Sequence, residues 1–373
     1  MDVSDDCDTL QILAAAMMSD LDALASVRME SGITLLNSGA PDAIREAIRC
    51  FEEAIDLRGR LPLAENPGYR YGLAGAWINR GDALARLGAV ENLADAVNSY
   101  TTAIDLLKDA PASGDGLFAK RLAIAWLNRG IALEAQACEP ALAEAGRSFE
   151  AAVNVLTRSH RVGDASHDLV LASAWTNLGN TFLRAAGTES AAQAADVAAR
   201  ALSLLVETEA KELAAAEAGL KARHILCQAL IALMAEPSRD DSLEMDFISR
   251  VTDTAEDALQ LAQHWEKAGE PRFRLLATQF FHLSTLVYER HQPHFLAEFL
   301  LDHLDPEQAT CWLPLDESWF AIGRESLSRV RRGFAKRDFA WLATPEGIRQ
   351  LQSLKELDAA EARLKIPCGS GRD

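Results

Sequence analysis

Hydrophobic residues recur along most of this chain at the spacing of an α-helix. In the segment that begins at Trp77, the residues Trp77, Gly81 and Leu84 lie at positions i, i+4 and i+7, and the segment around Tyr100 repeats this spacing. Residues spaced in this way share one face of a helix. Alternation of apolar and polar residues, which is typical of β-strands, does not occur over a useful length. The pattern therefore predicts an all-α protein.

The predicted helices form a repeat with an interval of 49 residues. Three similar segments, WINRGDAL, WLNRGIAL and WTNLGNTF, begin at Trp77, Trp126 and Trp175. One glycine in each first helix keeps the interval, at Gly32, Gly81, Gly130 and Gly179. One position in each second helix keeps it as well, at Phe51, Tyr100, Phe149 and Ala198. Each unit thus predicts a helix–turn–helix hairpin that has to stack on its neighbours to bury its apolar faces.

The recurrent glycine has a physical consequence. A glycine inside a helix is less favourable than alanine by roughly 0.5–1 kcal/mol. Its repetition therefore predicts that the paired helix approaches closely at this position. We expect the large aromatic residue of the second helix to fill the space that the glycine leaves.

This pattern resembles the tetratricopeptide repeat, whose first helix carries W-x2-L-G-x2-Y and whose second helix carries A-x3-F-x2-A. The segment from Trp175 to Phe182 matches the first motif, and the segment from Ala145 to Ala152 matches the second. The interval is longer than the about 34 residues of that family, and the additional residues fall mainly between units. The resemblance implies a right-handed α-solenoid of stacked antiparallel helix hairpins, with longer loops between them.

The repeat divides the chain into four predicted parts. Residues 1–19 lead into the array, residues 20–268 form the TPR-like array, residues 269–366 form a C-terminal helical module or cap, and residues 367–373 form a disordered tail. The division at residue 268 reflects the loss of the interval. Gln228 stands where the next glycine is expected, and the segments after Pro271 are helical in pattern but do not repeat.

Charge and cysteine content narrow the class of function. Acidic residues outnumber basic ones by 55 to 37, for a formal net charge of -18, which argues against a chain-wide surface for nucleic acid. The six cysteines are scattered without a CxxC pair, and no apolar stretch reaches the about 18 residues of a membrane span. The N-terminus is acidic where a targeting peptide is basic. We therefore expect a cytoplasmic protein that is not inserted in a membrane.

Three asparagines at the repeat interval, Asn79, Asn128 and Asn177, are the first candidates for partner binding. The resemblance implies that this first-helix position faces the inner groove, where a side-chain amide can hydrogen-bond the backbone of an extended peptide. Asp82 and Asn180 lie one turn further along two of the same helices. The alternative is that the asparagines serve only helix packing. The lysines with which the chaperone-binding subgroup grips a C-terminal carboxylate are missing here.

Two sets of basic residues have competing interpretations. Arg80 and Arg129 repeat beside the asparagines, and they either present a cationic row to acidic partner residues or pair with acids on a neighbouring helix. Arg329, Arg332 and Lys336 share a helical face within the densest basic cluster. That cluster suggests nucleic-acid binding, but the interleaved aromatic residues favour docking within the chain or onto a protein.

Catalytic and cofactor motifs are absent from the sequence. It contains no GxxxxGK[ST], no Rossmann glycine fingerprint and no GxSxG. The histidines between His282 and His303 lack the spacing of a metal site, so we expect neither metal nor cofactor. The leading hypothesis is a non-enzymatic scaffold or adaptor that binds a protein or peptide, with basic residues favoured in the partner, in the concave groove of the solenoid. The alternative is a regulatory sensor whose C-terminal module binds a ligand or nucleic acid through the basic cluster. The oligomeric state stays open.

Overall fold

The computed structural model describes residues 3–109, 116–159, 163–185, 187–234, 241–291, 293–304 and 317–334, together with residue 355. Within these ranges the chain forms helices and no strand, as the sequence predicts. The helices are α1 (Val3–Ser38), α2 (Pro41–Gly59), α3 (Pro67–Leu87), α4 (Val90–Leu107), α5 (Leu117–Ala135), α6 (Glu139–Ser159), α7 (Ala165–Ala185), α8 (Thr188–Leu205), α9 (Leu213–Met234), α10 (Asp241–Lys267), α11 (Phe273–His291), α12 (Pro293–Leu304) and α13 (Glu317–Phe334).

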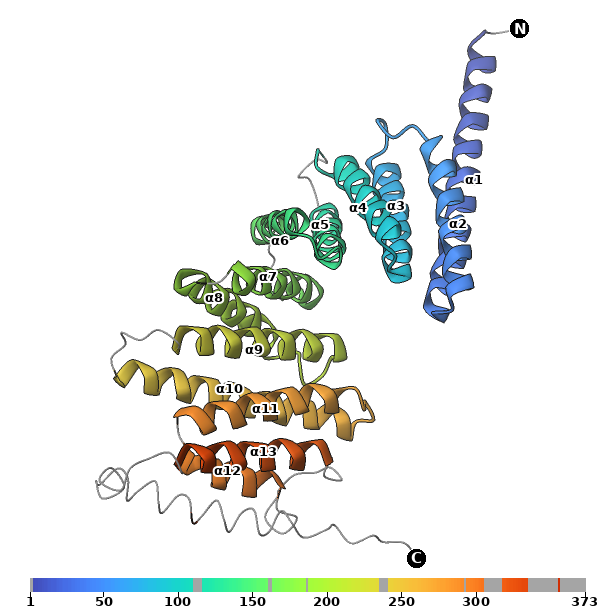
Figure 1. Cartoon of the computed structure of the whole chain (residues 1–373). Helices are drawn as coiled ribbons and strands as arrows, with labels where there is room; N and C mark the ends of the chain where they lie inside the picture. The colour runs from blue at the N-terminus through green and yellow to red at the C-terminus, as the bar shows by residue number, and fades with distance from the viewer. Residues whose placement is uncertain are drawn as a thin grey trace, which may run out of the picture. The chain divides into compact units, whose positions relative to one another are not determined.

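The chain divides into two compact units, Met1–Thr181 and Phe182–Asp373. In the first unit, helices pack as consecutive hairpins, α1 with α2, α3 with α4 and α5 with α6 (Figure 1). The second helix of one hairpin also contacts the first helix of the next, α2 with α3 and α4 with α5. The fold is therefore an all-α solenoid of stacked antiparallel hairpins.

Each hairpin of the first unit is closed by a glycine that lies under an aromatic ring. A Cβ atom added at Gly32 would lie 2.5 Å from the ring of Phe51, and one added at Gly81 would lie 2.6 Å from the ring of Tyr100. Gly130 has the same relation to Phe149. All three rings are buried. The predicted close approach of the paired helices is confirmed at these three positions.

Local sequence accounts for where the helices of the second hairpin begin and end. The side chain of Asn66 accepts a hydrogen bond of 2.8 Å from the backbone N–H of Gly68, and Pro67 occupies the first helical position of α3. Both features stabilise a helix N-terminus. Gly88 follows α3 with φ of 71°, a left-handed conformation that glycine adopts without strain. The predicted break at Leu87–Gly88 is therefore a helix end.

The second unit has one continuous apolar core to which α8 to α13 contribute. The ring of Phe281 stacks on the ring of Trp319 with centroids 4.4 Å apart and on the ring of Phe299 with centroids 5.4 Å apart. The core contains residues on both sides of position 268, such as Leu259 and Phe273. The separate module at residues 269–366 stays a prediction, and the predicted tail at residues 367–373 lies outside the described residues.

Candidate functional site

The first helices α3, α5 and α7 are connected by pairs of polar side chains. The Asn128 amide nitrogen on α5 donates a hydrogen bond of 2.9 Å to Oδ1 of Asp82 on α3. The hydroxyl of Tyr100 on α4 donates to the same oxygen at 2.7 Å. Further along, the Asn180 amide nitrogen on α7 donates a hydrogen bond of 2.8 Å to Oε1 of Glu134 on α5. These bonds hold amides and carboxylates in defined positions along one face.

Asp82 is half-buried beside the fully buried Tyr100. Burial raises the pKa of its carboxyl above the usual 3.8, while the hydrogen bonds from Tyr100 and Asn128 and the nearby Arg86 cation act in the opposite direction. Burial also raises the pKa of the Tyr100 hydroxyl, and the Asp82 carboxylate raises it further. Tyr100 therefore stays a proton donor to Asp82 over the whole neutral range.

An exposed apolar residue lies between the two polar pairs. Ile131 follows Asn128 by three residues and precedes Glu134 by three, so the three side chains share one face of α5. The side chain of Ile131 is 45% exposed. We use the term first-helix face for the surface formed by Asp82, Asn128, Ile131, Glu134 and Asn180. It combines one open apolar contact with polar groups whose orientation is already set.

The three predicted asparagines are not equivalent in the structure. All are half-buried, but only Asn128 bridges two helices. The Asn177 amide nitrogen donates a hydrogen bond of 2.8 Å to the carbonyl of Ser173 in its own helix, and the Asn79 side chain has no hydrogen bond to any described residue. The series is therefore regular in sequence and irregular in its bonding, and a peptide contact by Asn79 or Asn177 stays a hypothesis.

Arg80 and Arg129 point away from the first-helix face. Arg80 forms an ion pair of 3.0 Å with Glu52 on α2 and donates to the hydroxyl of Ser99 on α4 at 2.8 Å. Arg129 donates a hydrogen bond of 2.8 Å to Ser148 on α6, which corresponds to the Arg80–Ser99 bond, and it also forms an ion pair with Glu144 on α6. The interpretation that these arginines pair with acids on neighbouring helices is confirmed, and they do not form one site with the asparagines.

Arg121, near the start of α5, is a half-buried cation that the sequence pattern did not indicate. Its guanidinium carbon lies 3.4 Å from the ring centroid of Tyr71, and it donates a hydrogen bond of 2.8 Å to the Tyr71 carbonyl. Among the described residues no carboxylate lies within ion-pair distance of it. Burial lowers the pKa of Arg121, and the Arg58 cation lowers it further. The equivalent position one repeat earlier is Gly72. The arginine therefore does not recur at the repeat interval, and the repeat did not draw attention to it.

The basic cluster near the C-terminus is partly neutralised. Arg329 forms ion pairs of 2.7 Å with both Glu289 and Glu325, and the hydrogen bond that it donates to Glu289 raises the pKa of the guanidinium. Arg332 is exposed, and Lys336 lies outside the described residues. The carboxylates around Arg329 oppose phosphate binding at this residue, and the nucleic-acid alternative for the cluster stays a hypothesis.

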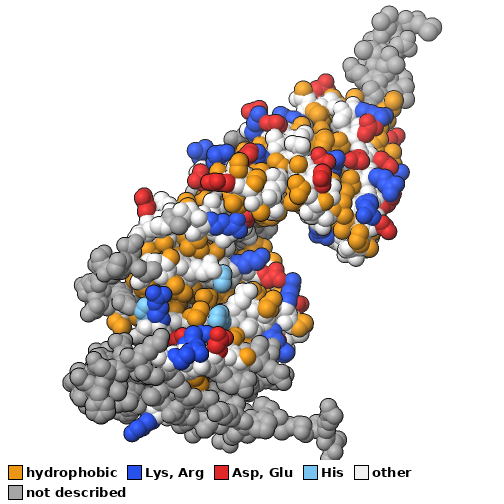
Figure 2. Space-filling model, in the orientation of Figure 1, with side chains coloured by type: hydrophobic (Ala, Val, Ile, Leu, Met, Phe, Trp, Pro, Cys, Tyr) orange, Lys and Arg blue, Asp and Glu red, His pale blue; other side chains and the backbone are white. Residues whose placement is uncertain are grey.

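The described residues contain neither a metal-ligand cluster nor a membrane-spanning helix. Within these ranges no three His, Cys, Asp or Glu side chains are grouped as metal ligands. No helix in the described part of the chain has the length and apolar character required to cross a bilayer. On the side of the first unit seen in Figure 2, acidic, basic and apolar side chains are intermixed.

Comparison with known proteins leaves the family open. No family model matches the chain, and no curated protein matches it in sequence. A solved circular tandem repeat protein with a novel repeat topology is 17% identical, with 95% of this chain and 85% of that chain covered and a TM-score of 0.35. The nuclear import adaptor Nro1, a hypoxic regulator of sterol synthesis, is 12% identical, with 92% and 99% covered and a TM-score of 0.40. These similarities are too low to argue from, and the fold class follows from the packing of the chain's own helix hairpins.

Proposed function

We propose that this chain is a non-enzymatic scaffold or adaptor with a TPR-like array that binds a segment of a partner protein on its first-helix face. The observation that carries the proposal is the exposed Ile131 between two polar pairs that already link consecutive first helices. An apolar anchor flanked by oriented hydrogen-bonding groups is the usual composition of a protein-binding surface. Because those groups are held in place, little further ordering opposes binding.

The partner segment we propose carries an apolar residue that covers Ile131 and basic or amide groups beside it. Asp82 and Glu134 flank Ile131 with carboxylates, and the whole chain has a formal net charge of -18. Opposite charge on the partner accelerates association more than it strengthens the complex. The association rate is therefore expected to fall as salt is added.

The test compares two variants that add the same charge at different exposed apolar residues. Ile131→Glu changes the first-helix face, and Val90→Glu changes an exposed residue at the start of α4 in the same unit. Proteins retained from cell extract by the immobilised wild type and by each variant are identified by mass spectrometry. The expected partner is retained by the wild type and Val90→Glu and lost with Ile131→Glu.

Affinity measured by calorimetry with that purified partner then gives the magnitude. Losing one apolar anchor and burying a charge opposite it should weaken binding at least about tenfold, which corresponds to about 1.4 kcal/mol. The proposal is wrong if no retained protein distinguishes Ile131→Glu from Val90→Glu.

A further inference from the structure

One side of α1 exposes residues whose counterparts in the next hairpin are buried. Leu24 and Val27 are 48% and 56% exposed. The residues one interval later, Leu73 and Ala76 on α3, are 5% and 0% exposed. Ala76 packs against Ala25 and Ala54, which belong to the preceding hairpin. This side of a first helix is therefore the side on which a preceding hairpin stacks, and in α1 no described residue covers it.

Three exposed apolar residues of α1 lie on one side of the helix. Met17 is also exposed, and Met17, Leu24 and Val27 lie at i, i+7 and i+10, which places them on one side of the helix. We use the term α1 end face for these three residues with the exposed Asp20 and Arg28 beside them. Isolated exposed apolar residues are ordinary, but a stripe that corresponds to a buried contact elsewhere in the same fold indicates an interface.

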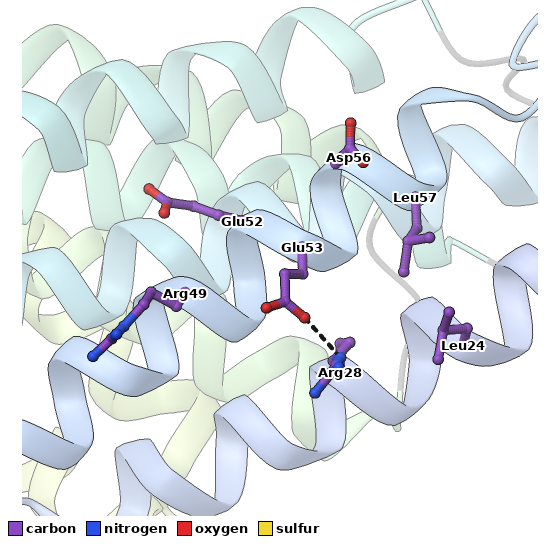
Figure 3. Close-up of a pocket in the computed structure, with 7 residues that line it drawn as sticks. All are labelled: Leu24, Arg28, Arg49, Glu52, Glu53, Asp56 and Leu57. Carbon is purple, nitrogen blue, oxygen red and sulfur yellow. Dashed lines mark ion pairs between the residues drawn. The ribbon is translucent and has the colours of Figure 1, made fainter.

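The α1 end face continues into a shallow depression shared with α2. Leu24 and Leu57 line it from the two helices, and charged side chains from both surround them (Figure 3). Its volume is about 430 Å³. Across it, Arg28 forms an ion pair of 2.7 Å with Glu53. α1 spans 36 residues and α2 spans 19, and α1 extends past the end of its partner helix (Figure 1). The part of α1 beyond α2 therefore leaves room for a second long helix beside it.

We propose that the α1 end face binds the same face of a second copy of this chain, with the two α1 helices antiparallel about a two-fold axis beside Leu24. Charge supports a second copy as the occupant. Asp20 lies four residues before Leu24 and Arg28 four residues after it. In an antiparallel pair centred on Leu24, each Arg28 therefore comes level with the Asp20 of the other copy, which would be a second carboxylate for this guanidinium beside Glu53 of its own chain. A surface that is complementary to itself closes as a dimer, and the contact would cover the side of α1 that corresponds to the buried side of α3.

The first measurement is molecular mass in solution, by light scattering after gel filtration and by sedimentation equilibrium at micromolar concentration. The wild-type chain has a mass of 40.5 kDa and is expected to sediment at twice that mass. Leu24→Glu places two like charges at the proposed axis and should give a monomer with unchanged far-UV circular dichroism. Leu117→Glu on α5 is the matched control, because Leu117 is 49% exposed; this variant should stay dimeric.

A charge exchange tests the antiparallel arrangement itself. Asp20→Arg and Arg28→Asp should each weaken the dimer about tenfold or more, because like charges then face each other. The double variant restores opposite charges and should recover most of the affinity. Such recovery requires that positions 20 and 28 face each other between the two copies.

Three results would overturn the proposal. They are a wild-type chain that is monomeric throughout, a dimer that Leu24→Glu leaves intact, and a double charge variant no stronger than the single ones. The proposal is independent of partner binding on the first-helix face, so Ile131→Glu should leave the dimer unchanged.

Discussion

Gly81 and Gly130 bring the paired helices of the first unit together beneath the rings of Tyr100 and Phe149, whereas the described residues of the second unit contain no comparable series. There the rings of Phe281 and Trp319 stack inside a core shared by α8 to α13. In the first unit each contact joins neighbours only, so the same residue types can recur at each hairpin. In the second unit a core side chain contacts several helices at once, and the space between those helices limits which side chain fits. The repeat therefore disappears from the sequence where the core becomes continuous.

The two units differ in how far their ion pairs are shielded from water. Arg80 and Arg129 lie half-buried between second helices, and their carboxylate partners Glu52 and Glu144 are partly open to water. In the second unit Arg223 and Glu209 form a bidentate pair with both hydrogen bonds at 2.7 Å, and both residues are buried. A buried charge that loses its partner is far more costly than an exposed one.

The largest expected effect follows from that difference. Arg223→Met leaves the Glu209 carboxylate buried without its partner and should lower the free energy of unfolding by about 3–5 kcal/mol. Arg80→Met is the control in the first unit, where Glu52 remains half-exposed to water, and about 1 kcal/mol or less is expected. Urea unfolding followed by circular dichroism measures both. Equal losses of unfolding free energy in the two variants would mean that the two ion pairs contribute equally to stability.

Glycine beneath an aromatic ring gives the next effect. Gly130→Ala places a Cβ against the ring of Phe149 and should lower stability by about 1–3 kcal/mol, because an overpacked contact forces the ring or helix to move. Gly59→Ala at the end of α2 meets no atom within 4 Å and should be neutral or stabilising by up to about 1 kcal/mol. Combining Gly130→Ala with Phe149→Leu should recover part of the loss. A stabilising Gly130→Ala would show that close approach is not why glycine recurs.

A smaller effect distinguishes the asparagines of the first unit. Asn128→Ala removes one of the donors to the partly enclosed Asp82 carboxylate and should cost about 1 kcal/mol, reduced by the better helix preference of alanine. Asn177→Ala removes only a bond to its own helix and should change stability by less than about 0.5 kcal/mol. Thermal and urea unfolding of both variants provides the comparison. A larger loss for Asn177 would reassign the packing role to that position.

The smallest effect concerns pH. Because the folded-state pKa of Asp82 is raised, the folded chain binds this proton more tightly than the unfolded chain. Ionising Asp82 therefore costs stability as the pH rises from about 3.8 through the raised pKa, and that cost is absent below 3.8. Relative to the wild type, Asp82→Asn should gain stability over this interval and show a constant difference above it. Unfolding free energies at a series of pH values test the sign, and a difference that is independent of pH would contradict it.

The hairpins of the first unit were predictable from the sequence because their signals are local. Helical spacing, the glycine opposite an aromatic residue and the break at Gly88 each depend on residues within one unit, and each recurs where that unit recurs. The pairing of Arg80 and Arg129 was predictable only as one of two alternatives. An arginine at this position can contact either a partner protein or an acid on a neighbouring helix. Only the packing of the neighbouring helices shows that an acid lies within its reach.

The sequence by itself determined the helix class, the hairpin and the small-to-large contact that closes each hairpin, because these follow from residue spacing and volume along the chain. Only the tertiary structure decided which polar residues act together. Asn128 bonds to Asp82 while Asn79 and Asn177 do not cross between helices, since the residue opposite each of them differs from unit to unit. It also decided that Arg121 lies on Tyr71 and that Leu24 and Val27 are exposed. Exposure of these residues depends on whether another part of a protein packs on α1, and the sequence of α1 alone does not show this.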